Sequence, residues 1–192
     1  MATETMEQAV TEAVRILREG GVILYPTDTV WGIGCDATNA EAVERIYSLK
    51  RSENKKSMLV QCATTAFDVR YVHKAPGNAF EVQELATKPL TLILPGASGV
   101  AANLIPEEGT LGVRIPDHAF CQAMLRKLGR PIVSTSANIS GEDTPRNLAE
   151  ISREIIDGVD YVVNPKFEGK PTGKASSILL FNEAGEFRII RE

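Results

Sequence analysis

Two stretches of the 192-residue chain place short polar side chains directly after apolar runs. The first, YPTDTVWGIG over residues 25–34, follows the apolar run VILY. The second, PIVSTSANISG over residues 131–141, carries Ser134, Ser136 and Asn138. Small hydroxyl and amide groups beside exposed backbone N–H groups are suited to binding phosphate oxygens. The second stretch is equally typical of a Ser/Thr-rich turn with a helix cap, and its residues alone leave both interpretations open.

Basic residues supply two further candidates. Lys50, Arg51, Lys55 and Lys56 gather in the segment LKRSENKKS over residues 49–57, which indicates either a local anion site or a solvated loop. Arg114 stands within the apolar run LGVRI. An arginine there must face solvent, form an ion pair or bind a ligand, and a guanidinium suits a two-point grip on a carboxylate.

Spacing argues against three familiar motifs. WGIGCDA has the glycines of a dinucleotide-binding fingerprint, but four residues separate them from the strand and the next helix starts only after Thr38. GKPTGKASS over residues 169–177 resembles a P-loop, yet Ala175 stands where Ser or Thr should follow Lys174, and a strand comes next. A loop reaching over a site remains open for that segment. The chain has no GxSxG sequence, which disfavours a serine hydrolase.

Composition excludes several classes of protein. A net charge of −4 disfavours nucleic-acid binding by the surface as a whole. Cys35, Cys62 and Cys121 are far apart, which favours reduced thiols over disulfides or a zinc site, and His73 and His118 are too few for a histidine metal centre. Neither a membrane-spanning apolar run nor a signal peptide is evident, so we expect a cytoplasmic protein.

Periodicity predicts alternating helices and strands in the first part of the chain and locally paired strands in the last part. The expected strands are 22–25, 57–62, 90–94, 111–115, 131–136, 161–164, 176–181 and 186–190. The expected helices are 6–19, one opened by a Thr38–Glu41 capping box, most of 64–87, 118–128 capped by Asp117, and one begun by Asn147 and Glu150. These elements predict an α/β fold with a twisted mixed parallel and antiparallel sheet, flanking helices and a site where polar loops converge.

The motifs also occur together in one order. YPTDTVWGIGCDA, LKRSENKKSMLVQ, PLTLILPG, LGVRIPDH, STSANISG and SSILLF extend over nearly the whole chain, which closely resembles the YrdC-type threonylcarbamoyl-AMP synthase family. The resemblance implies a single YrdC-like domain over residues 1–192, the short form of the family, with its sheet around a concave basic cavity.

The resemblance also implies an enzyme, a nucleotidyltransferase that makes threonylcarbamoyl-adenylate and pyrophosphate from L-threonine, bicarbonate or CO2, and ATP, for the t6A37 modification of tRNA. The amine of threonine takes up CO2, and the resulting carbamate attacks the α-phosphate. No enzyme nucleophile is needed, so positioning and electrostatics would carry the catalysis. We expect Mg²⁺ to accompany ATP, with no resident metal in the protein.

The family's functional residues map onto this chain at two groups of positions. L-Threonine would contact Thr27, Gln61, Arg114 and Ser176. ATP would contact Lys50, Lys56, Thr110, Ser134, Ser136, Asn138, Thr144 and Arg191. Lys50 and Arg114 would be catalytic. Trp31 is expected to pack, Gly32 and Gly34 to let the backbone pass beneath the substrate, and Asp28 either to cap the turn or to position the amine.

The basic segment departs from the family pattern. Ser52 stands at the family's arginine position, and Glu53 and Ser57 replace its prolines, so Arg51 is the candidate substitute. Gln61 stands where some members carry histidine. The expected partners are the three substrates and the proteins that transfer the product, with at most weak contact to RNA and none to a membrane. The alternatives are an RNA-binding or ribosome-assembly module and a carbamoyl-adenylate step in hydrogenase maturation.

Overall fold

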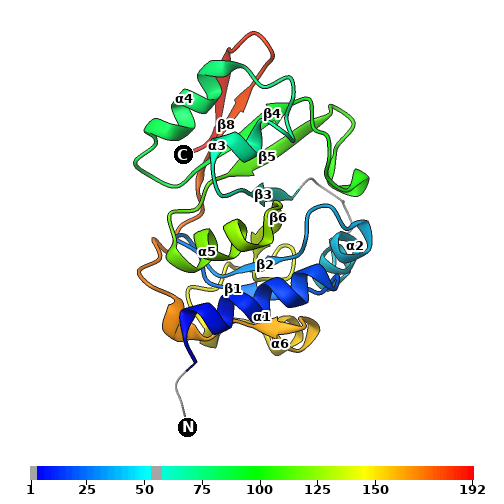
Figure 1. The fold of residues 1–192 in the computed structure, drawn as a ribbon, viewed down its shortest axis with the longest axis vertical. Coiled ribbons are helices and arrows are strands. Elements are labelled where there is room, and N and C mark those ends of the chain that lie inside the picture. The colour runs from blue at the N-terminus through cyan, green and yellow to red at the C-terminus, as the bar shows by residue number, and fades with distance from the viewer. Residues whose placement is uncertain (1–3, 53–57) are drawn as a thin grey trace.

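The computed structural model describes residues 4–52 and 58–192, and it confirms the predicted α/β fold (Figure 1). The strands are β1 (Ile23–Tyr25), β2 (Gly32–Gly34), β3 (Leu59–Gln61), β4 (Leu90–Pro95), β5 (Thr110–Arg114), β6 (Ile132–Ser136), β7 (Tyr161–Val162), β8 (Ser177–Phe181) and β9 (Phe187–Arg191). They form one sheet in the order β7-β1-β2-β6-β3-β5-β4-β8-β9. The pairs β1–β7, β3–β5 and β4–β8 are parallel and the others antiparallel, so the sheet is mixed as expected.

Helices pack on both sides of this sheet. The α-helices are α1 (Met6–Arg18), α2 (Ala40–Leu49), α3 (Thr65–Asp68), α4 (Gly77–Leu85), α5 (Ala119–Leu128) and α6 (Arg153–Gly158). Short 3-10 turns are η1 (Ala102–Leu104), η2 (Leu148–Glu150) and η3 (Pro165–Phe167). Helices α1 and α5 lie side by side along the lower half of the molecule in Figure 1.

Alternation along the strands sends neighbouring side chains into two separate cores. Ile23 and Tyr25 of β1 pack with α1 and α5, whereas Leu24 between them packs with α2. Ile132 and Val133 of β6 divide in the same way. The face that carries Ile23 and Ile132 is called the α1/α5 face below.

The α1/α5 face is open over the other half of the sheet. On β5, Thr110 and Gly112 belong to this face and remain half-buried, although β5 is flanked by strands on both sides. Leu111 and Val113 point to the opposite core and are fully buried. The sheet therefore presents an accessible surface over β3, β5, β4 and β8, and this surface is where the candidate site lies.

Two predicted helix starts are wrong by one residue. Asp36 Oδ1 accepts from both the backbone N–H and the hydroxyl of Thr38, so Asn39 caps α2 by accepting from Ala42 N. Asp117 is likewise not a cap, since the N-cap of α5 is His118. At α2 the contact of Thr38 with Asp36 leaves the cap to the next residue, and at α5 the backbone N–H of Asp117 is bonded to Asp28 Oδ2.

The other differences concern short elements. The helix expected at Asn147 is only the turn η2, and the following helix α6 is capped by Ser152 instead. Residues 64–87 contain two short helices with non-helical backbone between them. Gly32–Gly34, expected to be a loop, is strand β2, while the hairpin at residues 182–185 is confirmed by the bond from Asn182 N to Glu186 O.

Candidate functional site

Arg114 is held by the loop that follows β1. Its side chain is 4% exposed, and Nη2 donates to Asp28 Oδ1 at 2.5 Å while Nη1 donates to Thr29 Oγ1 at 3.1 Å. Of the three outcomes that the sequence left open for Arg114, the ion pair is therefore formed. The carboxylate is buried as well, with its side chain 11% exposed, so each partner offsets the desolvation of the other.

The two threonines of the same loop extend this network. Thr27 Oγ1 donates to Val30 O at 2.7 Å, and it lies 2.9 Å from Thr29 Oγ1. The Thr29 hydroxyl therefore donates to Thr27 while it accepts from Arg114, because the Thr27 proton is already used. Thr29 N also donates to Thr27 Oγ1. Thr27 is thus 2% exposed and engaged within the loop, and its predicted contact with L-threonine stays a prediction.

A second buried chain of polar groups runs beside Arg114. Tyr25 Oη lies 3.3 Å from Gln61 Oε1 and 2.8 Å from Ser134 Oγ. Burial raises the pKa of the Tyr25 hydroxyl above its usual range, so it remains protonated. The Tyr25 hydroxyl has a single proton, which it donates to Ser134 Oγ in the shorter bond, while Gln61 Oε1 at 3.3 Å is at the limit of a hydrogen bond. Two predicted site residues are therefore joined through a tyrosine that sequence reasoning did not select.

The glycines of β2 explain how Tyr25 reaches this position. A Cβ atom on Gly34 would lie 2.9 Å from the Tyr25 ring and 2.6 Å from Val133 O, and one on Gly32 would lie 3.3 Å from the same ring. The Tyr25 ring therefore lies across the glycine backbone of the neighbouring strand. The described residues show these glycines making room for a side chain of the protein, and their expected role in letting the backbone pass beneath the substrate stays a prediction.

Two buried donors near this cluster have no partner among the described residues. They are Gln61 Nε2 and Arg114 Nε. Gln61 and Arg114 are direct neighbours in the parallel pairing of β3 with β5 and face the same side of the sheet. A buried N–H group without an acceptor is costly, so the pair favours a ligand that brings acceptor oxygens, such as a carboxylate.

Lys50 lies at the end of β6. It forms the C-cap of α2, and Nζ donates to Ser136 O and to Asn138 O, both at 2.6 Å. The structure thus brings three predicted ATP-site residues together. Burial lowers the pKa of Lys50 to about 8, because desolvation disfavours the ammonium form. Its charge has carbonyl partners here and no carboxylate among the described residues.

Ser176 and Arg191 form a third group at the start of β8. Ser176 Oγ lies 2.7 Å from Thr91 Oγ1, and Arg191 donates through Nε and Nη2 to Ser176 O. Thr91 is the register partner of Arg114 in the β4–β5 pair. This group is therefore next to the Arg114 cluster, and Arg191, which the resemblance assigned to the nucleotide, lies here beside a residue assigned to threonine.

The remaining predicted residues are spread more widely. Thr110 is at the opposite end of β5 from Arg114 and lines a cavity of about 470 Å³ beside the β8–β9 hairpin. Thr144 is exposed in a loop. Lys56 lies outside the described residues. Arg51, the candidate substitute for the family arginine, pairs with Glu154 at 2.6 Å. The basic character expected for the cavity stays a prediction.

Other expectations concern packing and metals. Trp31 is 1% exposed and packs in the core, while its Nε1 donates to Glu168 Oε1 at 2.6 Å. Cys35, Cys62 and Cys121 are free thiols. Within residues 4–52 and 58–192, no three His, Cys, Asp or Glu side chains gather as metal ligands would. No helix in the described part of the chain is long and apolar enough to cross a membrane.

Comparison with known sequences identifies relatives over most of the chain. A family model for Sua5, YciO and YrdC proteins, described as "Telomere recombination", matches residues 15–192. The threonylcarbamoyl-AMP synthase of Idiomarina loihiensis is 35% identical over 161 residues, which cover 82% of this chain and 87% of that protein. The threonylcarbamoyl-AMP synthase of Halorhodospira halophila is 34% identical over 85% of this chain and 87% of that protein.

Solved structures agree with this assignment. E. coli YciO superposes with a TM-score of 0.81 at 26% identity and covers 99% of this chain and 91% of its own. P. abyssi Sua5 complexed with L-threonine superposes with a TM-score of 0.83 at 24% identity over 94% of this chain, which shows the shared fold. This chain spans about half of that Sua5 chain, 52% of its length. The sequence match and the fold together show that the chain belongs to the Sua5/YciO/YrdC family.

Proposed function

We propose that this chain is a threonylcarbamoyl-AMP synthase, a nucleotidyltransferase that forms threonylcarbamoyl-adenylate and pyrophosphate from L-threonine, bicarbonate or CO2, and ATP. The observation that carries the proposal is the identity of 29–35% to proteins of that name over 82–85% of this chain. The product would serve the t6A modification of tRNA. The two unpartnered donors beside Arg114 support the proposal, because they suit an amino-acid carboxylate.

The threonine end of the site is proposed to lie at the Arg114 cluster. Arg114 Nε and Gln61 Nε2 would donate to the carboxylate of threonine. Thr27 would approach from the loop after β1, where it contacts Thr29, and Ser176 from the start of β8, where it contacts Thr91. With the carboxylate bound there, the amine is left free to take up CO2 and become a carbamate, with release of one proton.

The nucleotide end is proposed to lie at the remaining predicted residues, beginning at the end of β6. Lys50 Nζ donates to the carbonyls of Ser136 and Asn138. Tyr25 contacts both Ser134, which is on the same strand as Ser136, and Gln61. Lys56, Thr110, Thr144 and Arg191 complete the proposed ATP contacts. The carbamate oxygen would attack the α-phosphorus as the bond to the β-phosphate oxygen breaks, so pyrophosphate leaves with its electron pair. Lys50 would offset the charge that gathers between the two anions.

Three further features belong to the proposal. Mg²⁺ would enter with ATP, held by phosphate oxygens, and would supply charge neutralisation there. The chain would act as a single domain over residues 1–192, consistent with one sheet that extends from Ile23 to Arg191. It would work in the cytoplasm and pass its product to the proteins that complete the transfer to tRNA.

Release of pyrophosphate from ATP tests this function. We expect release only when L-threonine and bicarbonate are both present, because the nucleophile is made from the two. Each co-substrate is omitted in turn, and D-threonine serves as a stereochemical control. Release that ignores threonine, or none at all from a folded preparation, would contradict the synthase. RNA binding that weakens steeply with salt and occurs without turnover would instead favour the RNA-binding alternative.

A further inference from the structure

We propose that Asp28 is the positioning residue of this site: it fixes the guanidinium of Arg114 so that Nε faces the carboxylate of the substrate. The inference rests on the proposed function, since it takes Arg114 to be the carboxylate-binding residue. Asp28 touches neither reacting atom in this arrangement and acts only through Arg114.

The first observation is how the donors of Arg114 are distributed. Asp28 accepts a hydrogen bond from Nη2 at 2.5 Å, and Thr29 accepts one from Nη1 at 3.1 Å. Nε is buried without a partner. A guanidinium is planar, so hydrogen bonds to both of its terminal nitrogens fix the direction in which Nε points. The free donor is therefore aimed before any ligand arrives, which lowers the entropic cost of binding.

The second observation is that Asp28 is itself immobilised from several directions. Its Oδ2 accepts from Asp117 N at 3.2 Å, at the loop that leads into α5. Its own carbonyl accepts from Thr172 N at 2.9 Å, and the Thr29 carbonyl accepts from Gly173 N at the same distance. The segment 169–177, which resembled a P-loop in sequence, thus lies along the loop after β1 and holds it in place.

The third observation concerns charge. The Arg114–Asp28 pair is buried and close to neutral as a unit. A ligand carboxylate then meets aimed N–H groups rather than a free cation, and recognition depends on the geometry of Nε and Gln61 Nε2. Removal of Asp28 would release the guanidinium to rotate toward any acceptor, so binding would weaken although the positive charge remains.

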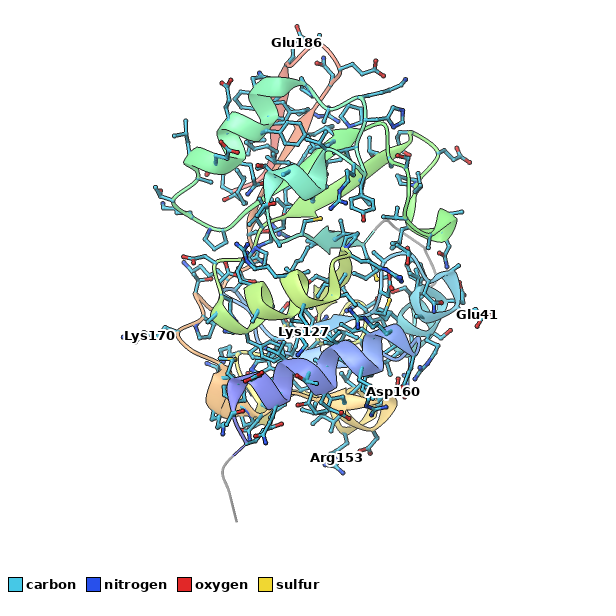
Figure 2. All side chains as sticks on the ribbon, viewed as in Figure 1. Glu41, Lys127, Arg153, Asp160, Lys170 and Glu186 are labelled. Atoms are coloured by element: carbon cyan, nitrogen blue, oxygen red, sulfur yellow. The ribbon has the colours of Figure 1, made fainter. Side chains whose placement is uncertain are left out.

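The fourth observation supplies a route for a direct test. Asp28 forms part of the wall of a cavity of about 700 Å³, together with Asp117, Gln122, Lys170 and Thr172, and Arg114 is not among its lining residues. Lys170 projects away from the molecule at the edge of this region (Figure 2). Asp28 therefore borders this cavity and also contacts Arg114 through Oδ1. Truncation of Asp28 would open a path from the cavity to the guanidinium.

The experiment is chemical rescue of Asp28→Ala with formate. We expect Asp28→Ala to raise KM for L-threonine by about 30-fold and KM for ATP by less than about twofold. Formate that enters from the cavity should restore the second anchor of Arg114 and lower KM for threonine by at least about threefold. Chloride at equal ionic strength should have no such effect. Asp117→Ala is the matched control, because it removes an exposed carboxylate from the same cavity wall without touching Arg114.

A second readout separates this inference from the proposed function. Restricted rotation of a paired guanidinium gives separate NMR signals for the Nη protons of Arg114. We expect these signals in the wild type, their loss in Asp28→Ala and their return with formate, whatever reaction the protein catalyses. Unchanged Arg114 signals in folded Asp28→Ala would overturn the positioning role. Signals that behave as expected, without any threonine-dependent pyrophosphate release, would overturn the proposed function and leave the positioning role standing.

Discussion

The candidate site contains two buried cations in different settings. Arg114 is 4% exposed and donates to a carboxylate and to a hydroxyl. Lys50 is 6% exposed and donates to two backbone carbonyls. Both lie next to residues of a polar strand end, Arg114 beside Thr29 and Lys50 beside Ser136. They differ in whether a neighbouring residue balances the charge.

The difference assigns a different physical task to each end. The Arg114–Asp28 pair is near neutral and rigid, which suits recognition of a small ligand by geometry. The charge of Lys50 is not balanced by a carboxylate, which suits interaction with a highly charged group such as a triphosphate. Burial has lowered the pKa of Lys50 to about 8. The comparison predicts that changes at Arg114 act mainly on threonine, and that changes at Lys50 respond to pH.

The largest effect is expected from Arg114→Ala. It removes the proposed carboxylate donor and leaves Asp28 buried without its cation, so KM for threonine should rise by about 100-fold and stability should fall by about 3 kcal/mol. KM for ATP should change by less than about twofold. Steady-state pyrophosphate release at varied threonine and varied ATP, with urea unfolding, measures these quantities.

Arg114→Lys is the control for charge. It keeps the cation but loses the planar fork, so its effect on threonine should be intermediate and its stability close to that of the wild type. Equal increases of the two KM values in Arg114→Ala would contradict the separation of the two ends.

The next largest effect is the pH dependence of stability that Lys50 causes. The folded pKa, about 8, is below the usual value of 10.5, so between these two pH values the unfolded chain binds more protons than the folded one. Stability due to this group therefore rises with pH in that window and is lowest below pH 8. Between pH 7 and pH 9.5 the wild type should gain about 2 kcal/mol relative to Lys50→Met, because desolvation of the ammonium is relieved.

Urea unfolding of the two proteins at both pH values measures this difference, and the subtraction cancels the other titrating groups. A difference between wild type and Lys50→Met that does not change with pH would show that Lys50 is not desolvated in the folded protein. In that case Lys50 and Arg114 would differ only in their hydrogen-bond partners.

A third prediction uses the two glycines beneath Tyr25. Gly34→Ala would place Cβ 2.6 Å from Val133 O, a backbone atom that cannot give way, so stability should fall by about 2 kcal/mol. Gly32→Ala is the matched control, since its closest contact is the Tyr25 ring at 3.3 Å, and it should cost less than about 1 kcal/mol. Thermal unfolding compares the two. A larger loss in Gly32→Ala would contradict the packing of Tyr25 described above.

Much of the fold was predictable because its signals are local. The alternation of Ile23, Leu24 and Tyr25 and the helical stripe of α1 depend only on neighbours in the sequence. The caps of α2 and α5 were wrong by one residue because Thr38–Asn39 and Asp117–His118 each offer two capping candidates. A contact to Asp36, only two residues away, decides the first choice, so that error lay in choosing between two local signals.

For the candidate site, the resemblance named residues but not the connections between them. The resemblance selected Arg114, Gln61 and Ser134, which the structure brings into one neighbourhood. It did not reveal that Asp28, 86 residues before Arg114 in sequence, is the ion-pair partner. Nor did it reveal Tyr25, whose part depends on two glycines of another strand leaving room for a ring. Such contacts arise from strand pairing between distant segments, so they become visible only in the folded chain.

The smallest expected effect, from Tyr25→Phe, examines the connection between the two ends. The change keeps the ring but removes the hydroxyl that joins Gln61 to Ser134, so stability should fall by about 1 kcal/mol. Gln61 Oε1 then loses its 3.3 Å contact with the Tyr25 hydroxyl, the amide is free to turn, and KM for threonine should rise by about threefold. Tyr47→Phe is the control, because its hydroxyl donates to Asn103 O at 3.1 Å away from the Arg114 cluster. It should lower stability by a similar amount and leave KM for threonine unchanged, so equal KM values in the two variants would show that the Gln61 amide is held without Tyr25.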